Sequence, residues 1–173
     1  MFSLSGIIKQ STWKERNNMD KVIHKSVKLS CGPAQAFQFF TGSEHLASWL
    51  TNAAEVEPVA GGKYELFWAP DDRENDSTIG CKVLAIEENK LLVFEWKGTR
   101  QFASLMNEAR PLTHVVVSFI PDGEGTNVQL VHNGWGSTEE WDAARGWFEQ
   151  AWNMALAGLE KYASAQPVAK CCE

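Results

Sequence analysis

One segment, residues 137–163, restricts the fold more than any other part of the chain. Its apolar residues recur every three or four positions, which is the period of one face of an α-helix, and no proline follows before Pro167. Ser137 and Glu140 have the spacing of a capping box, which predicts where the helix begins. At about 1.5 Å per residue the helix would be roughly 40 Å long. Because Trp147 and Met154 widen its apolar face, the helix needs a large complementary surface.

Most of the remaining chain alternates apolar and polar residues, a pattern typical of β-strands. A first strand is predicted over residues 22–29, and two short helices follow over residues 34–40 and 44–50. Further strands are predicted over residues 54–59, 63–68, 78–86, 90–96, 113–120 and 126–133. Residues 98–112 lack the alternation and are expected to form a long connection that holds a turn of helix. Connections of this length are often lids or binding loops.

The order of these elements predicts an α+β fold. Consecutive strands joined by tight turns pair antiparallel, and a sheet covered on one face by a helix curls around it. We therefore expect a curved antiparallel sheet of about six to seven strands around the long C-terminal helix, with the two short helices between strands one and two. A cavity is expected between sheet and helix. We expect one domain over residues 19–164, an N-terminal extension over residues 1–18 and a tail over residues 165–173.

Composition and charge exclude several classes of function. The net charge is −6 and no stripe of Lys and Arg is present, which disfavours nucleic acid. No apolar run approaches 18 residues, so no membrane span is predicted, and the first eighteen residues lack the apolar core of a signal peptide. The four cysteines show no CxxC spacing, which favours free thiols in a reducing, cytoplasmic setting.

No pattern in the sequence predicts a cofactor, a metal ion or a familiar catalytic mechanism. The four histidines are scattered over different elements without the spacing of metal ligands. No nucleotide-binding or hydrolase motif is present, and no nucleophile, base and orienting residue are brought together. We therefore expect neither metal nor cofactor, and the sequence favours a protein that is not an enzyme.

The aromatic residues of the strands and of the long helix are the best candidates for a binding site. Aromatic side chains give a cavity a large contact area at a small entropic cost, and a few polar side chains would orient a ligand among them. The same aromatic residues could instead fill an ordinary core. The ligand-binding residues predicted in this way are Trp49, Trp68, Phe94, Trp96, His132, Trp135, Trp152 and Asn153.

His132 has two interpretations. Its parity with Val128 and Leu130 points it inward, where a neutral imidazole could orient a ligand or act as a general base. Alternatively, it is a hydrogen-bonded core histidine beside Trp135. The sequence leaves both open.

Four segments, taken together in this order, resemble the START-like helix-grip superfamily (SRPBCC). Within it, the chain is similar to the branch named after the activator of the heat-shock-protein-90 ATPase. The segments are residues 33–37 with 44–49, residues 61–64, residues 80–86 with 91–96, and residues 128–135 with 152–162. The resemblance covers about residues 21–163.

The resemblance implies a helix-grip fold and leaves several functions open, since members of the superfamily bind lipids, hormones or polyketides and some catalyse cyclisation or dehydration. The first expectation is binding of a small apolar or amphipathic molecule between sheet and helix. The second is an interaction module that modulates a chaperone ATPase, although eighteen N-terminal residues are too few to replace the chaperone-binding domain of eukaryotic activators. The third is a cofactor-free enzyme that uses His132. A homodimer is also left open.

Overall fold

The computed structural model of the protein describes residues 21–167. Its elements are β1 (Ile23–Leu29), α2 (Pro33–Thr41), α3 (Ser43–Trp49), β2 (Ala53–Val56), β3 (Tyr64–Phe67), β4 (Val83–Glu87), β5 (Leu91–Trp96), η1 (Arg100–Phe102), α4 (Ala103–Met106), β6 (Thr113–Asp122), β7 (Gly125–Asn133) and α5 (Glu139–Ser164). The predicted extension over residues 1–18 and residues 168–173 of the predicted tail lie outside this range. The boundaries of the predicted domain stay a prediction.

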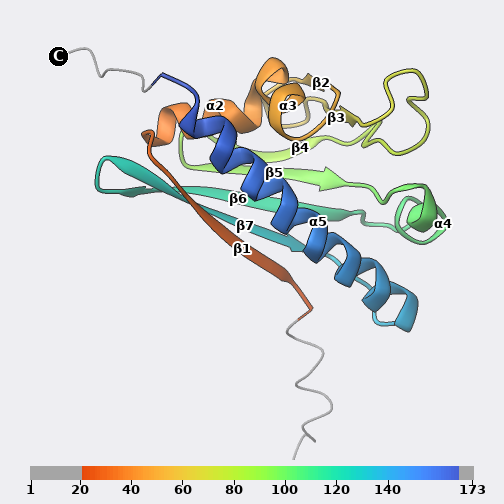
Figure 1. Cartoon of the computed structure of the whole chain (residues 1–173). Helices are drawn as coiled ribbons and strands as arrows, with labels where there is room; N and C mark the ends of the chain where they lie inside the picture. Colours follow the sequence, from red (N-terminus) through yellow and green to blue (C-terminus); the bar gives the residue numbers. More distant parts are fainter. Residues whose placement is uncertain (1–20, 168–173) are drawn as a thin grey trace, which may run out of the picture.

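The strands form an antiparallel sheet that α5 crosses on one face (Figure 1). Five strands pair in the order β1-β7-β6-β5-β4, and β2 pairs with β3 in a two-stranded sheet. Backbone hydrogen bonds link the two sheets, since the amide of Val83 in β4 donates to the carbonyl of Gly62 (2.9 Å), two residues before β3. The amide of Tyr64 in β3 also donates to the carbonyl of Cys81 (2.9 Å), two residues before β4. The α+β prediction, with a sheet around a long C-terminal helix and two short helices after the first strand, is confirmed.

The predicted strand over residues 78–86 is too long at its beginning. Strand β4 starts only at Val83, because the chain makes a turn immediately before it. The Cys81 amide donates to the Thr78 carbonyl (2.9 Å), and Gly80 has a φ of 81°, a conformation that favours glycine. Before this turn the chain runs beside β3, where the Thr78 amide donates to the Leu66 carbonyl (2.9 Å) and Ser77 forms an isolated bridge with Phe67.

The helix α5 has 26 residues and buries one row of side chains against the sheet. That row is Ala144, Phe148, Trp152, Leu156, Leu159 and Ala163, at the three- to four-residue spacing that the sequence predicts. Trp147 and Met154 lie off the row and are 41% and 72% exposed, because each residue turns a helix by about 100°. The apolar face is therefore wider than the surface that the sheet covers.

The beginning of α5 differs from the sequence prediction. The helix begins at Glu139 with Thr138 as its N-cap, and the Thr138 Oγ1 accepts a hydrogen bond from the Trp141 amide (3.5 Å). The capping box of Ser137 and Glu140 is therefore not formed. Thr138 provides the same kind of cap one position after Ser137, so the predicted helix start is one residue too early.

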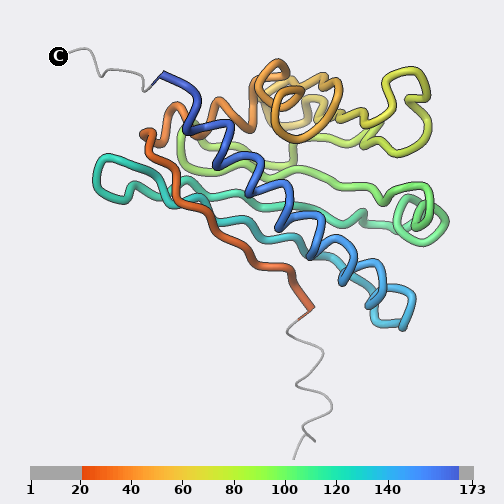
Figure 2. Tube along the Cα trace, viewed as in Figure 1, coloured from red at the N-terminus to blue at the C-terminus, as the bar shows by residue number. Residues whose placement is uncertain are grey.

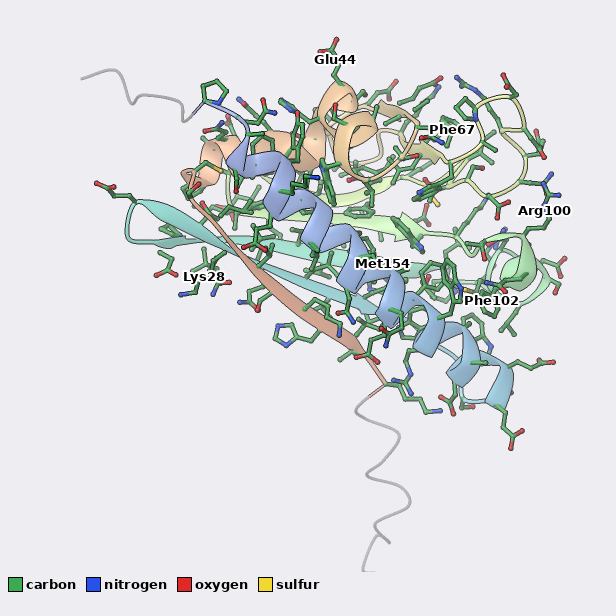
Figure 3. All side chains as sticks on the ribbon, in the orientation of Figure 1. Lys28, Glu44, Phe67, Arg100, Phe102 and Met154 are labelled. Carbon is green, nitrogen blue, oxygen red and sulfur yellow. The ribbon has the colours of Figure 1, made fainter. Side chains whose placement is uncertain are left out.

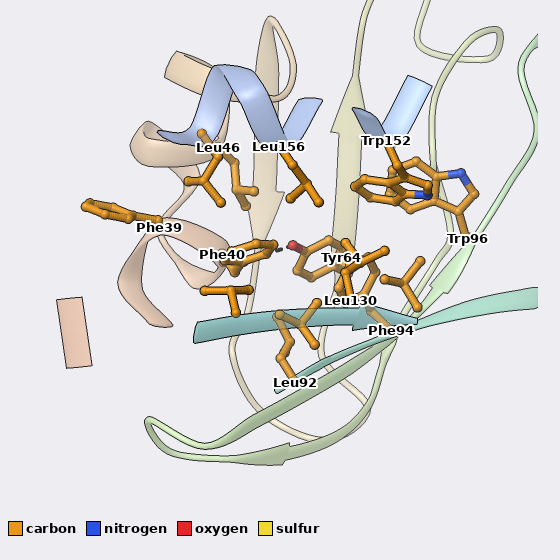
Figure 4. Packing of buried hydrophobic residues seen from close by; sticks show 14 of the residues in the cluster. Phe39, Phe40, Leu46, Tyr64, Leu92, Phe94, Trp96, Leu130, Trp152 and Leu156 are labelled. Carbon is orange, nitrogen blue, oxygen red and sulfur yellow. Dashed lines mark hydrogen bonds between the residues drawn. The ribbon is translucent and has the colours of Figure 1, made fainter. Parts of the chain in front are cut away.

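The short helices fill the space under the C-terminal half of α5. Phe39 of α2 packs edge-on against Tyr162 (ring centroids 5.5 Å apart), and the His45 Nδ1 lies 2.8 Å from the Tyr162 hydroxyl. Deeper in the core the Tyr64 hydroxyl donates to the Phe40 carbonyl (2.9 Å), and its ring stacks on Phe94 at 3.9 Å (Figure 4). Side chains pack closely at this end of the grip, and a cavity lies farther towards the N-terminus of α5.

Candidate functional site

A cavity of about 570 Å³ lies between α5 and the loops that follow β3 and β5. Figure 2 shows these two loops at the same end of the molecule. The residues of α5 that line the cavity, between Trp147 and Ala155, lie near the middle of the helix. The volume falls in the range of sites for small molecules. The lining residues are Trp49, Leu50, Trp68, Ala69, Asp76, Ser77, Trp96, Lys97, Gly98, Thr99, Trp147, Phe148, Ala151, Trp152, Met154 and Ala155.

Aromatic rings form the wall of the cavity. Trp96 from β5 and Trp152 from α5 lie close together (Figure 4), and their ring centroids are 5.0 Å apart. Trp68 meets Trp96 edge-on at 5.8 Å. Phe148, one turn before Trp152, lies 6.3 Å from Trp96. The strand and the helix thus present one continuous apolar surface, which can hold a flat or elongated apolar ligand.

Hydrogen bonds fix three of these indoles in place. The Nε1 of Trp49 donates to the Phe39 carbonyl (2.8 Å), and the Nε1 of Trp68 donates to the Leu50 carbonyl (3.0 Å). The Nε1 of Trp152 donates to the Nδ1 of His132 (3.1 Å). Each bond removes the cost of burying an indole N–H and holds the ring in one orientation.

Two polar atoms of the cavity residues have no hydrogen-bond partner among the described residues. They are the Nε1 of Trp96 and the Oγ1 of Thr99, and neither atom is exposed to solvent. Trp96 itself is only 3% exposed. Buried donors without a partner are uncommon in folded proteins because each costs about 1–3 kcal/mol. Both atoms are shielded by neighbouring protein atoms, although other atoms of the same two residues line the cavity.

Ion pairs join the two loops at the rim of the cavity. The Arg100 amide donates to the Asp76 Oδ1 (2.7 Å), and the Arg100 Nη2 donates to the Asp72 Oδ2 (2.9 Å). Figure 3 labels Arg100 beside this loop and Phe102 nearer to α5, where the Phe102 ring lies 6.0 Å from that of Trp147. The Arg100 side chain is 64% exposed, so these pairs add little stability and act mainly to position the loops.

His132 is completely buried and is not among the residues that line the cavity. Its Nδ1 accepts from Trp152, so the proton lies on Nε2, which donates to the Thr113 Oγ1 (3.0 Å). The Thr113 hydroxyl in turn donates to the Trp96 carbonyl (3.2 Å). Burial, with a smaller effect from His114, lowers the pKa of His132 well below its usual value. Because both ring nitrogens are bonded within the core, the geometry fits the core-histidine interpretation.

The other predicted site residues divide between cavity and core. Trp49, Trp68, Trp96 and Trp152 line the cavity. Phe94 is buried against Tyr64, and Trp135 packs on His132 with ring centroids 4.3 Å apart.

The helix turns Asn153 to an exposed position, where its Nδ2 lies 3.4 Å from the Gln150 Oε1. The sequence prediction missed Thr99, Lys97 and Asp76, which lie in loops without periodicity, and it assigned Trp147 and Met154 only to the helix face.

The described part of the chain holds neither a candidate metal site nor a candidate membrane span. Within residues 21–167, no three side chains of His, Cys, Asp or Glu are grouped so that they could hold a metal ion. No helix in that part of the chain is both long and apolar enough to cross a membrane.

Solved structures with the same fold come from several organisms. A protein from Mesorhizobium loti has a TM-score of 0.65 at 19% identity, over 85% of this chain and 99% of that one. The Aha1 dimer from Colwellia psychrerythraea has a TM-score of 0.64 at 19% identity, over 83% and 96% of the two chains. An HSP90 activator from Plasmodium falciparum has a TM-score of 0.63 at 20% identity, again over 83% and 96%. At these identities the likeness establishes the fold alone.

Sequence comparison identifies the family. No curated protein matches the chain. A family model described as Activator of Hsp90 ATPase homolog 1-like protein matches residues 30–164, which include every element from α2 to α5. The predicted resemblance is confirmed, and the chain belongs to the family of Activator of Hsp90 ATPase homolog 1-like proteins, with the START-like helix-grip fold.

Proposed function

We propose that the protein binds a small apolar or amphipathic molecule in the cavity beneath α5. The observation that supports this most directly is the aromatic cavity of about 570 Å³ itself. A chain under selection only for a stable core would fill such a space, because empty apolar volume reduces stability. Apolar walls with a few polar groups are typical of small-molecule sites.

A pair of matched substitutions on α5 tests the proposal. Ala151 lines the cavity, whereas Ala157 is exposed on the same helix, so the same change fills the cavity at one position and only adds surface at the other. We expect Ala151→Phe to weaken binding of 1-anilinonaphthalene-8-sulfonate by about tenfold or more, equivalent to about 1.4 kcal/mol. The measurement is the dye's fluorescence increase on titration.

Ala157→Phe is the control and should bind the dye as the unmodified protein does, with the melting temperature of both variants recorded. Equal binding by both variants would contradict the proposal. In a separate experiment, native mass spectrometry of protein purified from its own host would identify a natural ligand as a molecule that copurifies and is lost on denaturation.

A second candidate function, modulation of a chaperone ATPase, is supported by the family description and by the Plasmodium falciparum relative, whose own description is an HSP90 activator. It predicts that the protein raises the ATP hydrolysis rate of an Hsp90-type chaperone from the same host. The rate is measured with and without the protein and, as a control, with heat-denatured protein. An unchanged rate would remove this candidate. The Colwellia psychrerythraea relative is a dimer, so the assembly state of this chain belongs in the same experiment.

We also infer a reducing, cytoplasmic setting for either function. Cys31 and Cys81 are both buried free thiols. Burial raises the pKa of the Cys81 thiol to about 12, which keeps it protonated and unreactive.

A further inference from the structure

We infer that residues 1–20 of the chain bind along α5 and cover the mouth of the cavity. The contact forms within one chain, whether or not a ligand is bound, and so goes beyond the proposed function. Three features of the molecule support it, namely an exposed apolar stripe on the helix, the position of Lys21, and complementary charge.

The apolar stripe lies on the side of α5 that borders the cavity. Trp147, Ala151 and Met154 stand four and three residues apart, so they share one side of the helix. All three line the cavity, and Trp147 and Met154 are also exposed. Side chains that line a cavity and also reach solvent lie at its mouth. Exposed apolar side chains grouped in this way mark a surface that binds another segment or molecule.

Lys21 holds the beginning of the described chain beside α5. Its Nζ forms an ion pair with the Oδ1 of Asp142 (3.0 Å), in the first turn of the helix. From Asp142 to Met154 the helix rises about 18 Å, and it is about 10 Å across. Eight residues of extended chain span up to about 26 Å, so Trp13 can reach the stripe from Lys21. The segment is therefore long enough to cover the mouth of the cavity.

Residues 1–20 combine apolar side chains with an excess of basic ones. The large apolar residues include Phe2, Leu4, Ile7, Ile8 and Trp13, and the charged residues are Lys9, Lys14 and Arg16 with Glu15 and Asp20. A segment of this composition can cover an apolar stripe and pair with acidic residues beside it.

The helix carries the opposite charge over the turns that the segment must pass. From residue 139 to residue 154 it has four acidic residues against one basic residue. Two of the acidic residues, Asp142 and Glu149, pair with lysines at and near the start of β1. The other two, Glu139 and Glu140, are exposed and take part in no ion pair among residues 21–167. A second copy suits this surface less well, since two helices with the same excess of acidic residues would face each other.

Photocrosslinking of the full chain, without ligand, tests the contact. Met154→p-benzoylphenylalanine places the crosslinker in the stripe, and mass spectrometry of tryptic peptides identifies what it has bound after irradiation. We expect crosslinks to residues 1–20 of the same chain, which a mixture of isotope-labelled and unlabelled protein distinguishes from crosslinks between chains. Leu84→p-benzoylphenylalanine is the control and should give no such crosslink, because Leu84 is exposed on β4, at the opposite edge of the sheet from β1.

Charge reversal tests the role of the basic residues. Lys14→Glu combined with Arg16→Glu should lower the yield of the crosslink about fivefold, since one exposed ion pair changes such an equilibrium by up to about that factor. Glu139→Lys and Glu140→Lys, added to this variant, should restore the yield. Lys82→Glu combined with Lys90→Glu makes the same change of charge at exposed positions on either side of β4 and should leave the yield unchanged.

A crosslink within one chain that weakens on reversal of Lys14 and Arg16 supports the contact. Absence of this crosslink overturns it, and a crosslink formed only between chains overturns it by identifying a second copy as the occupant. An unchanged yield after reversal of Lys14 and Arg16 also counts against it. Because no ligand is present in these measurements, a failure of dye binding would contradict the proposed function and leave this contact standing.

Discussion

Replacement of Trp152 by alanine is expected to lower the free energy of unfolding by about 3–5 kcal/mol, the usual cost of removing a large aromatic side chain from a core. Trp152 is 2% exposed, its ring contacts Trp96, and its N–H is the partner of the His132 Nδ1. The substitution therefore enlarges the cavity and leaves a buried acceptor unpaired. Urea denaturation followed by circular dichroism measures the loss.

Trp147→Ala is the matched control on the same helix. Trp147 is 41% exposed and its ring meets those of Phe102 and Phe148 at the rim, so its loss should cost about 1 kcal/mol. Trp152→Phe separates packing from hydrogen bonding, since it keeps a ring but removes the donor to His132, at an expected cost of about 1–3 kcal/mol. Similar losses for Trp147→Ala and Trp152→Ala would show that α5 does not depend on this contact.

The second large effect is a loss of stability on mild acidification, caused by His132. In the folded protein burial holds the pKa of His132 well below its usual value, so the imidazole stays neutral. In the unfolded chain a histidine binds a proton below about pH 6.5. The unfolded state then holds more protons than the native state, and the free energy of unfolding falls as pH decreases, by up to about 1.4 kcal/mol per pH unit.

The measurement is the urea-unfolding free energy at intervals from pH 7.5 to pH 5, a range chosen to lie above the titration of ordinary carboxylates. His132→Gln should be less stable at pH 7.5, because it loses the bonds to Trp152 and Thr113, but its stability should depend less on pH. His24→Gln removes a histidine from an exposed strand position and serves as the control. Parallel profiles for His132→Gln and the unmodified protein would exclude His132 as the cause.

Periodicity predicted the architecture well because it reports which side of an element is buried. The row from Ala144 to Ala163 on α5 and the inward direction of His132 both follow from spacing alone. The start of α5 was misplaced because Ser137 and Thr138 are adjacent residues that can both serve as an N-cap, and the tertiary fold decides between them.

Half of the predicted site residues do not line the cavity. The alternation along a strand predicts whether a side chain points inward, but not which residues it contacts. His132 and Phe94 point inward as predicted, yet they contact Trp152, Thr113 and Tyr64, and neither is among the residues that line the cavity. Thr99 could not be recognised, since it lies in a connection without a repeating pattern and reaches the cavity only through the turn after β5. Contacts between loops that are far apart in the sequence can be identified only from the three-dimensional structure.

Folding stability and the capacity to acquire new ligand preferences often conflict during evolution, and in this cavity they depend on different residues. Trp49 and Trp68 are bonded to backbone carbonyls and Trp152 to a core histidine, so the scaffold of the cavity belongs to the stable part of the molecule. Ala151, Ala155 and the exposed Met154 complete the lining without such bonds. Substitutions at these positions can change the shape of the cavity with little loss of folding stability. The architecture is therefore evolvable, since new ligand preferences can arise in it while folding is preserved.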